Sequence, residues 1–204
     1  RDIAAEHADV VYSLSQTVEE ARAFYADLKA RAAEFGRLDN APLIIPGITI
    51  YTGTTQAEAQ ARFDELQALI DPLAGLNILY TFCGDLSGHD LDGPLPEHLF
   101  EGRITIGSGL LAKAKAENLT IRQLYESAAA GFTGRYIIGT AETVVDDLQP
   151  WFETGAADGF NICPPILPQG MADMSRFILP ELRRRGLFRT DYEGTTLRQN
   201  LGLG

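Results

Sequence analysis

Short apolar runs alternate with longer amphipathic stretches along most of this chain. The runs are rich in β-branched and aromatic residues and are bounded by turn or capping residues, which is typical of strands. Four runs are predicted as strands, over residues 8–13, 43–51, 135–139 and 158–162. Strands that alternate with amphipathic helices predict parallel pairing through right-handed crossovers, and therefore an α/β fold.

The stretch after the first strand has the clearest helical periodicity. Apolar residues recur every three or four positions from Val18 to Phe35, Ser15 or Thr17 can cap the helix, and Gly36 is expected to end it. Further helices are predicted after Thr54-Thr55, after Thr120 and after Thr140, and over residues 2–7, 109–117 and 173–185. The sequence therefore predicts four successive strand–helix units.

The regular pattern is lost between residues 73 and 118. Residues 77–96 are rich in Gly, Pro and Asp and too long for an ordinary connection, which favours a functional, lid-like insertion over a linker. Residues 186–204 are polar and irregular, and we expect a tail there.

Four strand–helix units make either a small open sheet or half of an eight-unit (β/α)8 TIM barrel. An open sheet usually carries a Gly-rich phosphate loop after an early strand, and none follows Ser13 or Thr52. The spacing therefore favours the half-barrel. Because the chain begins without Met, inside the helix expected over 2–7, we expect residues 1–204 to be part of a longer single-domain protein.

The net charge, the lengths of the apolar runs and the positions of the Cys and His residues limit which partners and ligands are expected. A net charge of −11 argues against nucleic acid, and no apolar run approaches the ~20 residues needed to span a membrane. Without a signal peptide, Cys83 and Cys163 are expected to be reduced thiols of a cytoplasmic protein. The spacing of His7, His89 and His98 predicts no metal site.

Several segments resemble one enzyme family. They are residues 138–148, 151–162, the insertion segment from Asp85 to Pro96 and the terminal segment from Pro180 to Leu203. Together they are similar to the bacterial luciferase-like flavin monooxygenases. Within that family they look like the subgroup of nitrilotriacetate, dibenzothiophene-sulfone and long-chain alkane monooxygenases, and the resemblance covers essentially the whole chain.

The resemblance implies the C-terminal half of a (β/α)8 barrel, over strands five to eight. It implies the oxygenase component of a two-component system, in which a separate flavin reductase supplies reduced FMN. The flavin reacts with O2 to form a C4a-(hydro)peroxide, which oxygenates a small organic substrate. One alternative is a deazaflavin-dependent oxidoreductase of the same superfamily. The segment over residues 190–203 argues against it, because it resembles the monooxygenase subgroup. A second alternative is a non-catalytic fragment.

Four residues are candidates for the site. Arg1 matches the arginine that follows the family's phosphate turn, so the resemblance places it near the FMN phosphate. Barrel sites lie at the C-terminal ends of strands. Tyr51 could there face substrate or pack under the next helix, and Asn161 could face the barrel interior or the helix layer. His89 is either a substrate or proton-transfer contact or an exposed loop histidine. The catalytic residues are expected mostly outside this chain.

A half-barrel also leaves two strand edges unpaired, here near Val10 and Phe160. Unpaired edges favour pairing with another chain. We therefore expect a homo-oligomer, or association with the missing N-terminal half.

Overall fold

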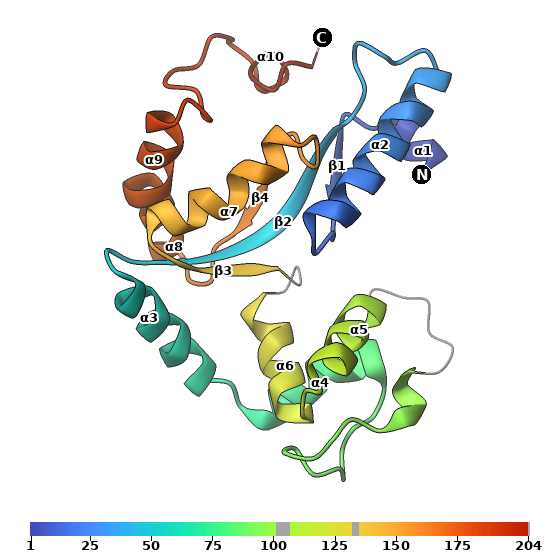
Figure 1. Ribbon diagram of the computed structural model, residues 1–204, viewed down its shortest axis with the longest axis vertical. Coiled ribbons are helices and arrows are strands. Elements are labelled where there is room, and N and C mark those ends of the chain that lie inside the picture. Colours follow the sequence, from blue (N-terminus) through green and yellow to red (C-terminus); the bar gives the residue numbers. More distant parts are fainter. Residues whose placement is uncertain (101–106, 132–134, 204) are drawn as a thin grey trace.

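The computed structural model describes residues 1–100, 107–131 and 135–203, and a parallel sheet lies at its centre (Figure 1). The strands are β1 (Val10–Ser13), β2 (Leu43–Thr52), β3 (Tyr136–Gly139) and β4 (Asn161–Cys163). Each strand pairing is parallel. The predicted α/β class is confirmed, and all four predicted strands are present.

β2 is the central strand, and the other three strands pair with it at different heights. β1 pairs with residues 43–46, β4 with 47–49 and β3 with 49–52. Neighbouring residues of a parallel strand direct their peptide groups to opposite edges. Leu43 donates its amide to Asp9, whereas the carbonyl of Ile44 accepts from Asp158. Thus β1 and β4 flank β2 on opposite edges.

This order differs from the consecutive order expected of four barrel units, because β4 pairs with β2 and not with β3. β2 has 10 residues, whereas β3 has 4 and β4 has 3, so each of them pairs with only part of β2, and the two paired stretches meet at Thr49. The half-barrel itself remains a prediction. As expected, β1 and β4 are edge strands within the described part of the chain; β3 is a third.

Helices follow the strands as predicted, with threonine caps at the expected places. Thr17, Thr55, Thr120 and Thr140 each accept a hydrogen bond from the third helical amide. The helices of the sheet region are α1 (Asp2–His7), α2 (Val18–Glu34), α3 (Gln56–Ala68), α7 (Ala141–Glu153), α8 (Gln169–Asp173), the π-helix η2 (Met174–Ile178) and α9 (Leu179–Arg184). The expected irregular tail contains one short helix, α10 (Leu197–Asn200).

The sheet and these helices form a strand lobe, residues 1–71 and 135–203. Its core is built from segments far apart in sequence: Ile48 and Ile50 of β2 pack with Ile137, with Val144 of α7 and with Ile178. Further along β2, Ile44 packs with Leu28 of α2. The even-numbered side chains of β2 thus face these helices, and by the alternation of a strand Thr49 and Tyr51 face the other way.

Residues 72–100 and 107–131 form a second unit, the helical lobe. Its helices are α4 (Pro72–Cys83), η1 (Glu97–Phe100), α5 (Gly107–Glu117) and α6 (Ile121–Ala130). The lobe has its own core, including Leu79, Leu111, Leu124 and Tyr125. The prediction of an irregular segment from residue 73 was wrong for α4. Asp71 caps this helix and Pro72 opens it.

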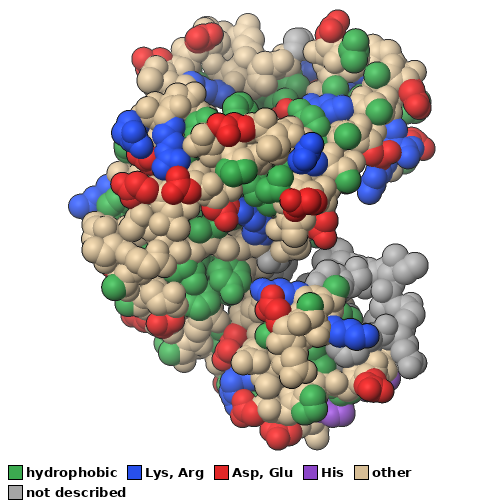
Figure 2. Space-filling model, in the orientation of Figure 1, with side chains coloured by type: hydrophobic (Ala, Val, Ile, Leu, Met, Phe, Trp, Pro, Cys, Tyr) green, Lys and Arg blue, Asp and Glu red, His purple; other side chains and the backbone are tan. Residues whose placement is uncertain are grey.

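The segment after α4 is fixed to α6 rather than free. Asp92 forms a two-point ion pair with Arg122, whose Nη1 also donates to the hydroxyl of Tyr125, and Arg122 donates its amide to Leu91. Leu86 is buried in the core of the lobe. This segment therefore belongs to the packed helical lobe, and the lid-like insertion over residues 73–118 stays a prediction. Figure 2 shows the surface hollowed between the helical lobe and the strand lobe.

Candidate functional site

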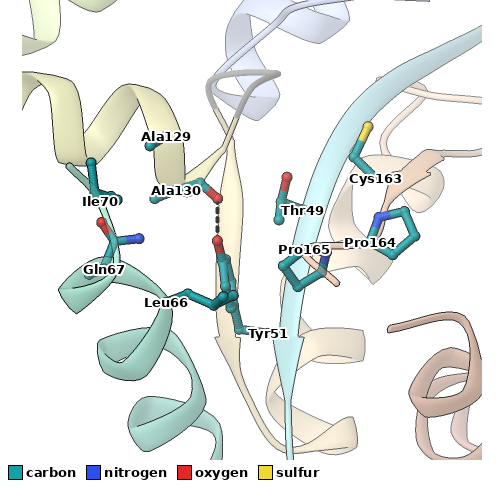
Figure 3. A pocket seen from close by; sticks show the side chains of 10 residues that line it. All are labelled: Thr49, Tyr51, Leu66, Gln67, Ile70, Ala129, Ala130, Cys163, Pro164 and Pro165. Carbon is teal, nitrogen blue, oxygen red and sulfur yellow. Dashed lines mark hydrogen bonds between the residues drawn. The ribbon is translucent and has the colours of Figure 1, made fainter. Parts of the chain in front are cut away.

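A pocket of about 300 Å³ lies where the two lobes meet (Figure 3). Four elements contribute to its wall. The lining residues are Thr49 and Tyr51 of β2, Leu66, Gln67 and Ile70 at the end of α3, Ala129 and Ala130 at the end of α6, and Cys163, Pro164 and Pro165 at the end of β4. Its volume is at the lower limit for small-molecule sites.

The pocket lies at the carboxyl end of a strand. Cys163 is the last residue of β4 and pairs with Thr49 of β2, and Pro164 follows where proline stops the ladder. In α/β proteins, ligands bind at this end of parallel strands. The position predicted from sequence for the site therefore contains a cavity.

Tyr51 is a fixed wall of this pocket. Its hydroxyl donates to the carbonyl of Ala130 at 2.8 Å, and its ring meets Phe63 of α3 edge-on with centroids 5.0 Å apart. Burial, with a smaller contribution from the neighbouring Tyr136, raises the pKa of Tyr51 to about 12. The phenol therefore stays protonated at neutral pH. Of the two roles predicted for Tyr51, it packs under the next helix and also lines the pocket.

Gln67 is the lining residue that sequence reasoning missed. Phe63, Leu66 and Gln67 fall on one face of α3, at the spacing of an amphipathic helix, and Ile70 follows two residues after the helix ends at Ala68. Gln67 is the polar exception on that face, and its buried Oε1 atom has no hydrogen-bond partner among the described residues. A polar residue within an apolar helical face was the signal that could have found it.

None of the described lining residues carries a formal charge. Thr49, the hydroxyl of Tyr51, the amide of Gln67 and the thiol of Cys163 are its polar groups. Tyr12 of β1 lies near Cys163: burial, and then this thiol, raise the pKa of Tyr12. The arrangement suits an uncharged, largely apolar ligand rather than an ionic one.

Asn161 and His89 do not line the pocket. Asn161 is exposed at the start of β4, on the side opposite Phe160, and its amide donates to the Cys163 sulfur at 3.7 Å. It therefore lies two residues before Cys163, the first residue of β4 in the wall. His89 is exposed in the segment after α4, where its amide donates to Leu86. Its site role remains a prediction.

Arg1 lies against α2. Its Nη1 donates to Asp27 at 2.7 Å, and its guanidinium stands 5.0 Å from the ring centroid of Phe24. More than half of the side chain is exposed. The position of Arg1 near a phosphate stays a prediction. In this structure its guanidinium is paired with the carboxylate of Asp27.

Two further findings concern metal ligands and membrane spans in the described residues. Among the described residues, no group of three His, Cys, Asp or Glu side chains could hold a metal ion. Within the same residues, every helix is too short or too polar to cross a bilayer.

With the sheet and pocket in view, comparison with known proteins defines the class. The family model of luciferase-like monooxygenases matches residues 1–158, and the chain belongs to this family. It is 43% identical to nitrilotriacetate monooxygenase component A from Aminobacter aminovorans, over 100% of this chain and 46% of that protein. It is 34% identical to dibenzothiophene-sulfone monooxygenase from Rhodococcus erythropolis, again over 100% and 46%.

Solved structures agree with this assignment. DmoA from Hyphomicrobium sulfonivorans matches with a TM-score of 0.84 and 27% identity, over 98% of this chain and 42% of that one. EDTA monooxygenase from Chelativorans sp. BNC1 matches with a TM-score of 0.71 and 30% identity, over 100% and 48%. The chain spans about half the length of the curated relatives it matches.

Proposed function

We propose that this chain forms the substrate side of the oxygenase component of a two-component, reduced-flavin-dependent monooxygenase. The observation that carries the proposal is the pocket at the end of β4, in a chain whose whole length matches named monooxygenases. A separate flavin reductase would supply the reduced cofactor, and O2 and a small organic compound would be the other reactants. When bound, the flavin supplies the oxygen-activating chemistry.

The described wall of the pocket, Arg1 and the start of α3 do not fit the phosphate of FMN. A phosphate needs cations or free helix-terminal amides, but the described wall of the pocket has no cation and Arg1 is paired with Asp27. At the start of α3, the amide of Thr54 is already bonded to the carboxylate of Glu58. We therefore propose that the flavin is held by parts of the protein beyond these residues, and we assign it no step here.

These residues would instead exclude water and hold the substrate. Leu66, Ile70 and Pro165 give the pocket an apolar wall, which would keep water from the reacting atoms. Tyr51 is held by Ala130 and Phe63 and would fix the shape of that wall. Thr49 and Gln67 present the polar atoms that can orient a bound molecule.

The direct test is oxygenation by the full-length protein. It would be incubated with a flavin reductase, NADH, FMN and isotope-labelled dioxygen, and offered nitrilotriacetate, dibenzothiophene sulfone or a long-chain alkane. We expect label in an organic product from at least one compound, with catalase present and only when the reductase is included. Absence of labelled product from every compound, together with no binding of reduced FMN, would contradict the proposal.

A titration with reduced cofactors separates this proposal from the alternatives. We expect the full-length protein to bind reduced FMN and the 204-residue chain to bind little or none. Binding of reduced deazaflavin in place of FMN would indicate the related oxidoreductase. Binding of neither cofactor by the full-length protein would favour a role in assembly alone.

A further inference from the structure

The amide of Gln67 has two polar atoms, and their surroundings differ. Neither Oε1 nor Nε2 forms a hydrogen bond within the described residues, but only Oε1 is fully buried. In Figure 3 the nitrogen of this amide points toward Tyr51 across the space between them, and the oxygen points away from that space. A molecule in the pocket therefore meets the N–H donors of Gln67 and not its oxygen.

Gln67 is distinct among the polar residues of the wall in offering a group that can only donate. The hydroxyl of Tyr51 already gives its hydrogen to the carbonyl of Ala130 at 2.8 Å. The hydroxyl of Thr49 can donate or accept, so it does not select between the two kinds of ligand group. A ligand that displaces water from the NH2 group of Gln67 without offering an acceptor loses a hydrogen bond.

The surroundings of this donor are apolar. Leu66 precedes Gln67 in α3, Ile70 lies three residues after it, and both line the pocket. Pro165 stands on the other side of the same space in Figure 3. An apolar cavity of about 150 Å³ already binds benzene, so a substituted aromatic ring fits a pocket of about 300 Å³. A ligand that reaches Nε2 therefore places an apolar body against these side chains.

The charge of the wall decides which acceptor is favoured. A carboxylate could also accept from Nε2, but it would lose its hydration without gaining a cation from the described lining residues. A neutral acceptor oxygen loses much less hydration when it enters an apolar site. The wall therefore favours a neutral acceptor over an anionic one.

We propose that Gln67 is a specificity-determining residue, whose Nε2 group donates a hydrogen bond to a neutral acceptor oxygen, such as that of a ketone, ester or amide, on an otherwise apolar substrate. The inference rests on the proposed function only in calling the ligand a substrate. It deepens that function, because it selects neutral acceptor-bearing compounds over polycarboxylates.

Three probes of nearly equal shape test this preference in the full-length protein without any flavin. Acetophenone carries a neutral acceptor and no donor, α-methylstyrene has a CH2 group in place of that oxygen, and benzoate carries a negative charge. Dissociation constants would be measured by calorimetric titration. We expect acetophenone to bind about threefold to tenfold more tightly than α-methylstyrene, the usual value of one neutral hydrogen bond, and benzoate to bind more weakly than acetophenone.

The hydrogen bond itself can be observed through the carbonyl of the bound ketone. Infrared difference spectra would be recorded with acetophenone labelled with carbon-13 at the carbonyl. A donated hydrogen bond lowers the stretching frequency of a carbonyl group. We expect a lower frequency for the ketone bound to the native protein than for the ketone bound to a variant that has no donor at position 67.

Two variants and one control separate the donor from the fold. Gln67→Met keeps the length of the side chain and Gln67→Leu shortens it; both lack the donor and should remove the preference for acetophenone over α-methylstyrene. Gln60→Met is the matched control, because Gln60 lies two turns earlier on the same helix, is exposed and donates to Asp64. It should change neither dissociation constant. Circular dichroism would confirm that each variant is folded.

Each outcome decides between the two ideas. Equal binding of ketone and alkene by the native protein, a preference or a carbonyl frequency unchanged in Gln67→Met, tightest binding of benzoate, or no binding of any probe would overturn the role of Gln67. Loss of the preference in Gln67→Met, in a protein that forms no oxygenated product, would sink the proposed function and leave the role of Gln67 intact. Oxygenation that proceeds while Gln67→Met keeps the preference would do the reverse.

Discussion

The strand lobe and the helical lobe are stabilised by different kinds of contact. In the strand lobe, Ile48 packs with Val144 and Ile178, so its core joins segments about a hundred residues apart or more. In the helical lobe, the buried core residues run from Leu79 to Ala128, so all of them come from this one stretch of the chain. A lobe built from local contacts can open by itself, whereas one built from distant contacts is lost as a whole.

The pocket depends on both kinds of structure. β2 and β4 of the strand lobe supply one wall, and the end of α6 in the helical lobe supplies another. The lobes are joined there by the Tyr51–Ala130 hydrogen bond and by Lys113 of α5, whose Nζ stands 5.5 Å from the ring centroid of Tyr136. The shape of the pocket therefore depends on how the helical lobe packs against the strand lobe.

The largest expected effect comes from emptying either core. Ile48→Ala and Leu124→Ala each truncate a fully buried side chain, and each should lower the free energy of unfolding by about 2–5 kcal/mol. Native-state hydrogen exchange should show lower protection across the strand lobe for Ile48→Ala, but only across residues 72–131 for Leu124→Ala. Uniform loss of protection in Leu124→Ala would mean that the lobes are one cooperative unit.

The crossing of α4 and α6 offers a sharper test within the helical lobe. A Cβ on Gly75 would lie 2.5 Å from Cγ of Tyr125, so Gly75→Ala should cost about 1–3 kcal/mol in chemical unfolding. Gly159→Ala in the strand lobe is the matched control, because its Cβ would meet Ile45 at an ordinary 3.7 Å. A neutral result at Gly75 would argue against this packing.

The link between the lobes should contribute less. Tyr51→Phe removes the hydroxyl that bonds Ala130, and the expected cost is about 1 kcal/mol in thermal unfolding. Faster exchange at the end of α6 should accompany it. Tyr136→Phe removes a neighbouring hydroxyl for which no hydrogen bond is found among the described residues. If Tyr51→Phe and Tyr136→Phe changed thermal unfolding and hydrogen exchange equally, the Tyr51–Ala130 hydrogen bond would not be what joins the lobes.

The smallest effect concerns pH. Hydrogen bonds from Arg184 and then Arg185 lower the pKa of Glu181 to about 2, below its ordinary value of 4.5. Since the folded-state pKa is depressed, the stabilisation is complete above pH 4.5 and is lost as the pH falls toward 2. The melting temperature of Glu181→Gln should therefore lie below that of the native protein at pH 7, and the gap should narrow below pH 4.5. A gap that stays constant with pH would contradict the ion pairs.

Sequence patterns predicted the strand lobe better than the helical lobe, for physical reasons. The threonine caps and β-branched runs of the strand lobe are local signals, so Thr17 and Thr140 marked real helix starts. α4 has no comparable stripe, because Leu79 packs inward while Leu73 and Tyr80 are exposed. The pairing of β4 with β2 depends on tertiary contacts that no local pattern carries.

The candidate site was predicted in position but not in composition. Tyr51 was identified because it ends a predicted strand. Gln67 was missed because its helix was judged by its apolar face alone, and Ala130 because it contributes a carbonyl rather than a side chain. Asn161 lies two residues before the wall, which contains Cys163 instead. Pocket walls are built from segments that meet only in the folded chain.

The central claim is that substrate binds in the pocket between the lobes. Leu66→Trp in the full-length protein would fill that pocket, and Gln60→Trp would add the same ring to the exposed side of α3. With reductase, FMN and whichever compound the native protein oxygenates, we predict that Leu66→Trp still oxidises reduced FMN but forms no oxygenated product, while Gln60→Trp forms it normally. Product formation by Leu66→Trp at the native rate would contradict the claim.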